Sequence, residues 1–132
     1  MILVDTSAWI DALGPRPGAI TQRLRAHLDR GEPCALTPVI LLEVLQGARS
    51  DREFDRLHAY LTAQPMLHPL DAVGTHARAA QLYRRCRAAA VTPRSSIDCL
   101  IAQLAIEHNA ALLHDDRDFD QIARVVPELM MA

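Results

Sequence analysis

The sequence predicts an α/β fold in which helices cover both faces of a parallel sheet. Short apolar runs alternate along the chain with longer stretches of helical periodicity, and this alternation is typical of strands joined by crossover helices. The length of 132 residues suits one domain that spans residues 1–132. Half of the residues are hydrophobic but only 4% are aromatic, so we expect a core of mainly Leu, Ile, Val and Ala.

The first half of the chain is expected to hold two strands and four helices. Asp5 or Thr6 is a suitable N-cap for the first helix, and Thr37 followed by Pro38 is a typical helix start. The expected elements are strand 2–4, a helix that ends at Gly14, helix 19–30, strand 33–36, helix 37–48 and helix 51–63.

The second half is expected to continue the alternation. Asp71 is a suitable cap for a long helix, and Asn109 is typical of the position just beyond a helix end. Two prolines weaken the prediction of a strand at 65–70. The expected elements are strand 65–70, helix 72–90, a helix ending near Asn109, strand 110–114, helix 118–125 and an edge strand at 128–131.

The charged residues and the cysteines exclude several classes of chemistry and indicate the cellular compartment. All fourteen basic residues are Arg, so phosphate contacts must use guanidinium groups, and chemistry that needs a Lys ammonium is excluded. A formal net charge of -2 argues against a uniformly basic nucleic-acid coat. Cys34, Cys86 and Cys99 have no paired spacing and indicate free thiols in a reducing compartment. The sequence shows no signal peptide or membrane span, and we expect a cytoplasmic protein.

Four acidic residues are expected to converge at one edge of the sheet. Asp5 ends the first strand, and Asp116 comes just after strand 110–114. The carboxyl ends of parallel strands border the ligand crevice in such folds. Glu43 lies among apolar neighbours, where an unpaired carboxylate would cost several kcal/mol. Asp98 stands in the first turn of its helix and completes the set.

Each acid also has a purely structural explanation. Asp5 could be an N-cap, Asp98 could form a capping box with Ser95, Glu43 could pair with a buried Arg, and Asp116 could be a turn residue. Several carboxylates in one pocket would, however, repel each other and raise their own pKa values. A divalent cation such as Mg2+ removes that penalty and can activate water for attack on a phosphate.

Four segments of the chain carry a resemblance to a known family: ILVDTSAWID, PVILLEVLQGA, RSSIDCLIAQLA and LLHDDRDFDQIA. Through them the chain resembles the PIN-domain family, in particular the VapC-type ribonuclease toxins of bacterial toxin–antitoxin pairs. The resemblance covers essentially the whole chain. It implies an α/β/α sandwich with a central parallel sheet and endonucleolytic cleavage of RNA that depends on Mg2+ or Mn2+. The family's four catalytic acids fall on Asp5, Glu43, Asp98 and Asp116.

The resemblance and the positions of single residues together suggest further site residues and partners. Asp118 is a nearby metal-binding helper, and a shift of one residue would select Asp115 in place of Asp116. Thr6 lines the site in the family, and Arg94 precedes the helix of Asp98, where it is placed to bind a phosphate. The expected partners are an RNA substrate, a second copy of the chain in a homodimer, and an antitoxin that blocks the acidic pocket.

The chain offers clustered acids and no evident pair of histidines that could act as acid and base. We therefore predict that a metal-bound water cuts the RNA and leaves 5′-phosphate and 3′-hydroxyl ends. The alternatives are a PIN-like nuclease that matures RNA or cuts DNA, and a catalytically silent binding module. A silent module would be expected to lack one of the acids, and all four are present. Receiver domains require a late Lys and aspartyl phosphatases a D-x-D pattern at the first strand, and this chain has neither.

Overall fold

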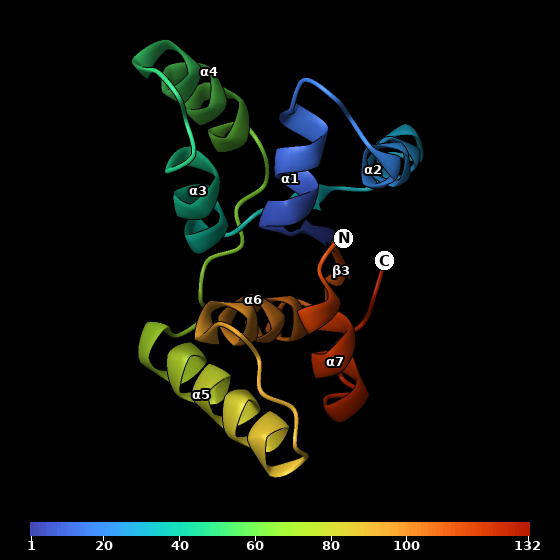
Figure 1. Ribbon diagram of the computed structural model, residues 1–132, viewed down its shortest axis with the longest axis vertical. Coiled ribbons are helices and arrows are strands. Elements are labelled where there is room, and N and C mark those ends of the chain that lie inside the picture. Colours follow the sequence, from blue (N-terminus) through green and yellow to red (C-terminus); the bar gives the residue numbers. More distant parts are fainter.

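A three-stranded parallel sheet lies at the centre of the computed structural model, which describes residues 1–132 (Figure 1). The strands are β1 (Ile2–Val4), β2 (Cys34–Ala35) and β3 (Ala111–Leu113), in the order β2-β1-β3. The central strand places Ile2 opposite Cys34 on one side and Ala111 on the other. This architecture confirms the expected α/β/α fold with a central parallel sheet.

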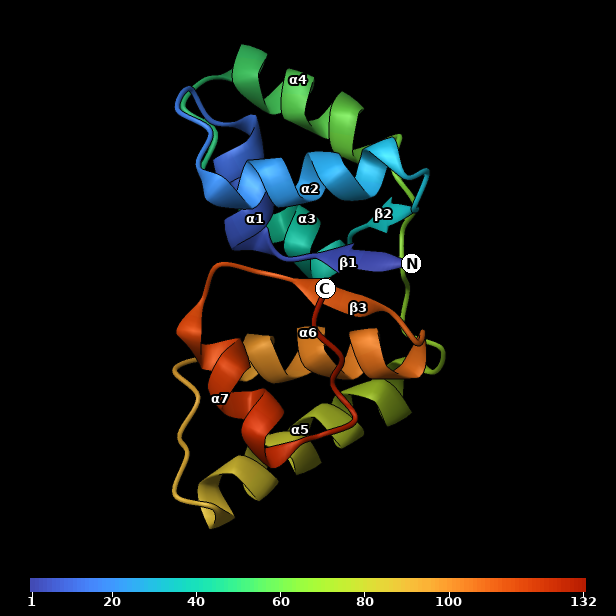
Figure 2. The ribbon, with the colours of Figure 1, turned by 90° about the vertical axis from the view of Figure 1, so that its right-hand side faces the viewer.

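Seven helices surround the sheet and form two groups. Figures 1 and 2 show the first four helices together on the β2 side of the molecule and the last three together on the β3 side. The first group is α1 (Thr6–Leu13), α2 (Ala19–Asp29), α3 (Pro38–Leu45) and α4 (Asp51–Thr62). The second group is α5 (Ala72–Ala88), α6 (Ser96–Glu107) and α7 (Arg117–Val125).

The predicted helix boundaries are largely confirmed by the caps. Asp5 is the N-cap of α1, and Thr37 caps α3 with Pro38 at its first position. Helix α5 ends two residues before the expected 90, because Ala90 adopts a left-handed φ of 60° that stops the helix. Asn109 has a φ of 52° just beyond α6, as expected for that position.

The predicted strands at 65–70 and 128–131 are wrong in length, since each contributes only one isolated parallel bridge. Leu36 bridges to Met66, and Leu112 bridges to Met131. The backbone N–H of Leu67 donates to the Leu36 carbonyl at 2.8 Å, but Pro65 and Pro69 flank this contact and a longer ladder does not form.

The core is aliphatic, as the composition predicted. Trp9 and Phe119 are the largest fully buried side chains, and Leu, Ile, Val and Ala make up most of the rest. All three cysteines are free and buried. None of the helices combines the length and the hydrophobicity that crossing a membrane would require.

A partly buried polar contact joins α5 to α6 away from the carboxyl ends of the strands. The Glu107 carboxylate, at the end of α6, accepts hydrogen bonds from Thr75 Oγ1 at 2.9 Å and from the backbone N–H of Leu70 at 3.2 Å. Thr75 is fully buried. This contact fixes the start of α5 against α6, and it was not anticipated from the sequence.

Candidate active site

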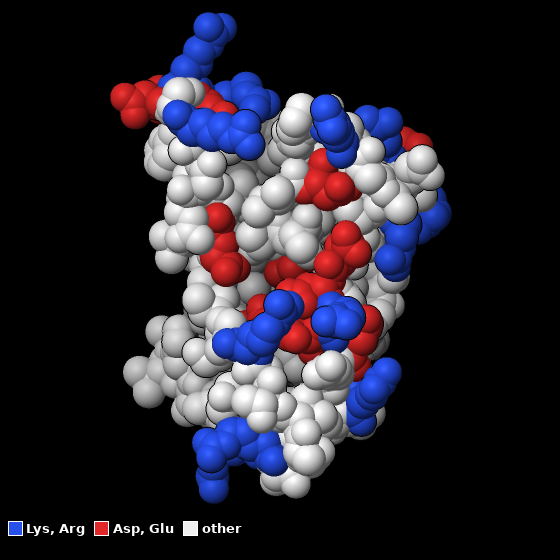
Figure 3. All heavy atoms as spheres, in the orientation of Figure 1, with Lys and Arg blue, Asp and Glu red and all other residues white.

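The carboxyl ends of β1 and β3 bring the first and last of the four acids to one edge of the sheet. Asp5 follows β1 directly, and its backbone N–H donates to the Leu113 carbonyl at the end of β3, at 2.9 Å. Asp116 lies a few residues beyond Leu113 as the N-cap of α7. In Figure 3, acidic side chains gather near the middle of this face, and basic side chains lie among them and partly in front of them.

Three of the acids form a group that fits a metal ion. Asp98 projects from the first turn of α6, Asp116 caps α7, and Asp118 lies in the first turn of α7. Each offers one carboxylate oxygen, and the three oxygens lie within 4.8 Å of one another. Three carboxylates gathered this closely offer the hard oxygen ligands that Mg2+ and Mn2+ prefer.

Asp5 and Glu43 lie close enough to this group for their charges to affect the pKa of Asp98. Burial, followed by the negative charges of Asp116, Asp5, Asp118 and Glu43, raises the pKa of Asp98 from 3.8 to about 7. Burial also raises the pKa of Asp5, although hydrogen bonds from Ser7 oppose the shift. The acids therefore repel each other in the metal-free protein, and a bound cation would relieve that repulsion.

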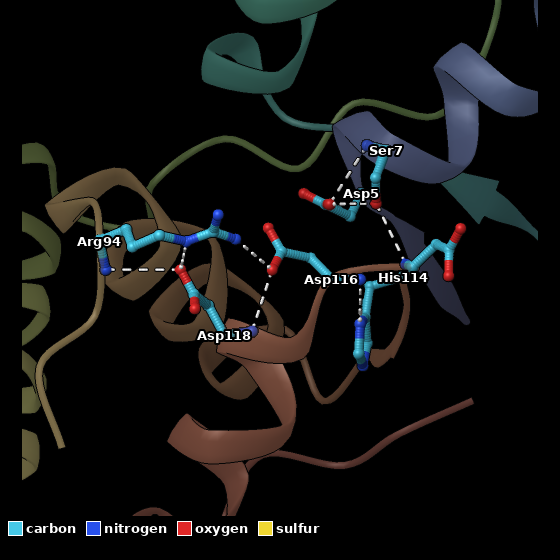
Figure 4. A network of polar contacts seen from close by, with 7 residues as sticks. Asp5, Ser7, Arg94, His114, Asp116 and Asp118 are labelled. Carbon is cyan, nitrogen blue, oxygen red and sulfur yellow. Dashed lines mark hydrogen bonds and ion pairs between the residues drawn. The ribbon is translucent and has the colours of Figure 1, made fainter.

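Two hydroxyl groups at the start of α1 orient two of the acids. Thr6 Oγ1 donates to Glu43 Oε1 at 2.7 Å and so joins α1 to α3. Ser7 Oγ donates to Asp5 Oδ2 at 2.8 Å and accepts from the backbone N–H of Asp115 at 3.1 Å (Figure 4). The family resemblance implied that Thr6 lines the site. It did not reveal that Ser7 links the turn after β1 to the turn after β3.

Arg94 lies against the acids, in the loop before α6. Its Nε donates to Asp118 Oδ2 at 2.9 Å, and its Nη2 donates to Asp116 Oδ1 at 3.0 Å (Figure 4). Its backbone N–H also donates to Asp118 Oδ2, at 3.4 Å. The sequence predicted a phosphate contact for Arg94. In the structure its guanidinium contacts two carboxylates of the acidic group, and the phosphate contact stays a prediction.

The structure places the two candidates for the fourth acid differently. Asp116 belongs to the group of three carboxylates, whereas Asp115 is exposed and lies outside the group. The backbone N–H of Asp116 donates to His114 Nδ1 at 3.1 Å, and His114 Nε2 lies 3.4 Å from Asp120. His114 therefore braces the turn that presents Asp116.

The structure bears out one of the purely structural roles considered for the acids and contradicts two others. Asp5 does cap α1, so its cap role and its place at the site coexist. Ser95 Oγ accepts from the Ile97 N–H, and no hydrogen bond reaches the Asp98 carboxylate, so the capping box is wrong. Glu43 is bonded to Thr6 and forms no ion pair, so pairing with a buried Arg is also wrong.

Comparison with known sequences agrees with this geometry. The sequence profile of the family described as PIN domain matches residues 2–125. The chain belongs to the PIN-domain family. This PIN domain is 41% identical over 128 residues to the VapC ribonuclease Mb1587 of Mycobacterium bovis and to the ribonuclease VapC11 of Mycobacterium tuberculosis. Each alignment covers 95% of this chain and 93% of the relative.

Solved structures share the fold of this PIN domain at low sequence identity. VapBC2 from Rickettsia felis, solved with a DNA fragment from its promoter, matches with a TM-score of 0.76 at 18% identity. That match covers 100% of this chain and 98% of the other. FitAcB from Neisseria gonorrhoeae matches with a TM-score of 0.69 at 20% identity, over 100% and 97% of the two chains. These similarities support the fold, and the acid cluster supports a site that could hold a divalent cation.

Proposed function

We propose that this PIN domain, as one unit over residues 1–132, is a metal-dependent endoribonuclease and the toxin of a type II toxin–antitoxin pair. One observation carries the proposal: three carboxylate oxygens lie within 4.8 Å of one another at the carboxyl end of the sheet. The 41% identity to proteins named VapC ribonuclease makes RNA the favoured substrate. The presence of all four acids argues against a silent binding module.

The proposed metal ligands are the carboxylates of Asp5, Glu43, Asp98, Asp116 and Asp118. Bound Mg2+ or Mn2+ would supply a Lewis acid and an activated water for attack on the phosphate. Ser7 holds Asp5 in place and Thr6 holds Glu43 in place, so that neither acid needs to reorganise when RNA binds. Glu43 Oε2 accepts no hydrogen bond from the protein and is available as a ligand.

The chemistry of these side chains predicts the ends of the cut RNA. Mechanisms that use the 2′-hydroxyl of RNA as the nucleophile need a general base and a general acid. The neighbouring His114 does not suit either role, because both of its ring nitrogens face partners within the protein. We therefore expect 5′-phosphate and 3′-hydroxyl ends from in-line attack by water.

The decisive experiment maps RNA ends after induced expression and repeats the cleavage with purified protein. Ligation-based mapping should find 5′-phosphates, and a 2′-deoxy substitution at the cut site should leave cleavage intact. A matched Asp98→Asn variant should leave the RNA uncut. Cyclic phosphate ends that form in EDTA would contradict the metal mechanism. Cuts confined to the ends of stable RNAs would favour the alternative role in RNA maturation.

An antitoxin is the protein partner that we propose. Solved neighbours of this fold include a toxin–antitoxin complex from Klebsiella pneumoniae, with a TM-score of 0.72 at 17% identity. A guanidinium from the partner would suit the clustered carboxylates and would exclude metal or RNA. Co-purification with the product of an adjacent gene should silence cleavage. A stable pair that cuts RNA as fast as the free protein would refute this mode of inhibition.

We also propose a cytoplasmic homodimer without a membrane partner. Free, buried cysteines suit a reducing compartment. Leu42 on α3 is 59% exposed, and Leu70 and Val73 near the start of α5 are 69% and 81% exposed. These two regions lie on the same side of the molecule in Figure 1. Light scattering should give a dimer mass, and Val73→Glu should lower it to that of a monomer if this surface is the interface.

A further inference from the structure

We propose that Arg94 is an exchangeable counter-ion of the acid cluster, which pairs with Asp116 and Asp118 in the metal-free protein and is released to an RNA phosphate when metal binds. The inference rests on the proposed function, because it assigns Arg94 a part in the use of metal and RNA by the same site. It goes beyond a simple phosphate contact, since it couples the two ligands through one side chain.

The hydrogen bonds show that Arg94 and a metal ion would use the same carboxylates. Asp116 Oδ1 accepts from Arg94 Nη2 and also from the backbone N–H of Asp118 at 2.9 Å. Asp118 Oδ2 accepts both the Nε and the backbone N–H of Arg94. Each carboxylate thus has one oxygen occupied and the other without a hydrogen bond. A divalent cation on the same pair would lie close to a guanidinium of like charge, and the two would disfavour each other.

The exposure of the side chains indicates which partner can leave. The Arg94 side chain is 73% exposed, whereas that of Asp118 is 10% exposed. An ion pair with so exposed a guanidinium is weak, and the side chain can rotate into solvent. The backbone N–H of Arg94 can keep its bond to Asp118 during this motion. The acids therefore stay in place while the guanidinium moves.

Arg85 provides a contrast with Arg94. Arg85 pairs with Glu128 at 3.4 Å and donates to the Val125 carbonyl at 3.3 Å, so it ties α5 to the end of α7. Arg94 makes no side-chain bond to a backbone carbonyl, and both of its side-chain partners belong to the metal-binding group. A released guanidinium beside the cluster can form the paired hydrogen bonds that a phosphate accepts.

Mn2+ titration by calorimetry tests the competition between metal and Arg94. Arg94→Gln removes the charge, Arg94→Lys keeps it, and Arg52→Gln is a control at an exposed position on α4. We expect Arg94→Gln to bind Mn2+ about fivefold more tightly, the upper range for loss of one exposed ion pair. Arg94→Lys and Arg52→Gln should bind Mn2+ like the wild-type protein.

Binding of a short fluorescein-labelled single-stranded RNA in Ca2+ tests the second half of the exchange. Arg94→Gln should weaken binding and reduce the salt slope of the affinity by about 0.7, as expected for one lost phosphate contact. A measurement that needs no variant is the NMR signal of the Arg94 Nε–H. This signal should shift towards that of a solvent-exposed arginine when Mg2+ is added to the wild-type protein.

The outcomes separate this inference from the proposed function. Tighter Mn2+ binding with weaker RNA binding in Arg94→Gln, and the NMR shift, support the exchange. Mn2+ binding that is unchanged or weaker in Arg94→Gln overturns it and shows that Arg94 only positions the acids. RNA binding that is unaffected in Arg94→Gln overturns the release to phosphate. If the wild-type protein binds Mn2+ and cuts RNA, these failures leave the proposed function standing. A folded wild-type protein that binds no Mn2+ overturns both proposals.

Discussion

Replacing Asp98 by Asn should stabilise the metal-free protein and abolish its response to metal. Burial and the neighbouring acids raise the pKa of Asp98 from 3.8 to about 7, so the ionised form is disfavoured in the folded state. Because the folded-state pKa lies above the unfolded value, the free energy of unfolding falls as the pH rises from about 4 to about 7. Asn carries no charge, and no hydrogen bond to the Asp98 carboxylate is lost.

The size of the effect follows from the shift in the Asp98 pKa. A change from 3.8 to about 7 is equivalent to roughly 4 kcal/mol, of which we expect about 2 kcal/mol to remain after the site relaxes and water enters. Asp98→Asn should therefore be about 2 kcal/mol more stable than the wild-type protein in EDTA near pH 8. The difference should shrink as the pH falls from about 7 to about 4.

Urea unfolding in EDTA and in Mn2+ measures both parts of this prediction. The wild-type protein should gain about 2.7 kcal/mol at a hundredfold excess of Mn2+ over its Kd, whereas Asp98→Asn should gain little. RNA cleavage by the variant should be absent. Equal stability of the two proteins in EDTA, together with equal gains from Mn2+, would refute the idea that Asp98 stands at the centre of a repulsive metal site.

Three further predictions concern the groups around the acids. Ser7→Ala should lower the free energy of unfolding by about 1–2 kcal/mol and weaken Mn2+ binding, because Asp5 and the Asp115 N–H both lose their partner; urea unfolding and calorimetry check this. Thr6→Val should reduce RNA cleavage about 10- to 100-fold with RNA affinity unchanged, measured by single-turnover kinetics. Glu107→Ala should cost about 2–3 kcal/mol of stability yet leave Mn2+ affinity intact, which thermal unfolding and titration would show.

Most elements of the fold could be predicted because their signals are local. Thr37 and Pro38 are adjacent residues that together favour a helix start. Asn109 favours a helix end because Asn tolerates the left-handed backbone conformation found there. Strand length depends on partners distant in the sequence and is not a local property. The segment around Met66 matches its neighbour at a single bridge, and only the packed sheet determines this.

The closeness of the acids could be predicted from their places at strand ends and in helices, but their hydrogen-bond partners could not. The contact between Ser7 and Asp115 joins residues 108 positions apart, and no local pattern reports it. The choice of Asp116 over Asp115 depends on the turn after β3, which directs one side chain inward and the next outward. The exposed guanidinium of Arg94 could equally have faced solvent, so only the structure shows that it faces the acids.

The central place of β1 in the sheet has a consequence for synthesis of the protein. A ribosome releases the chain from its N-terminal end, so β1 emerges early, whereas β3, its neighbour on one side, emerges late. A nascent chain exposed only as far as α6 already carries Asp5, Glu43 and Asp98. It lacks β3 and the turn that presents Asp116 and Asp118. The acid cluster is therefore incomplete until residue 118 has left the ribosome.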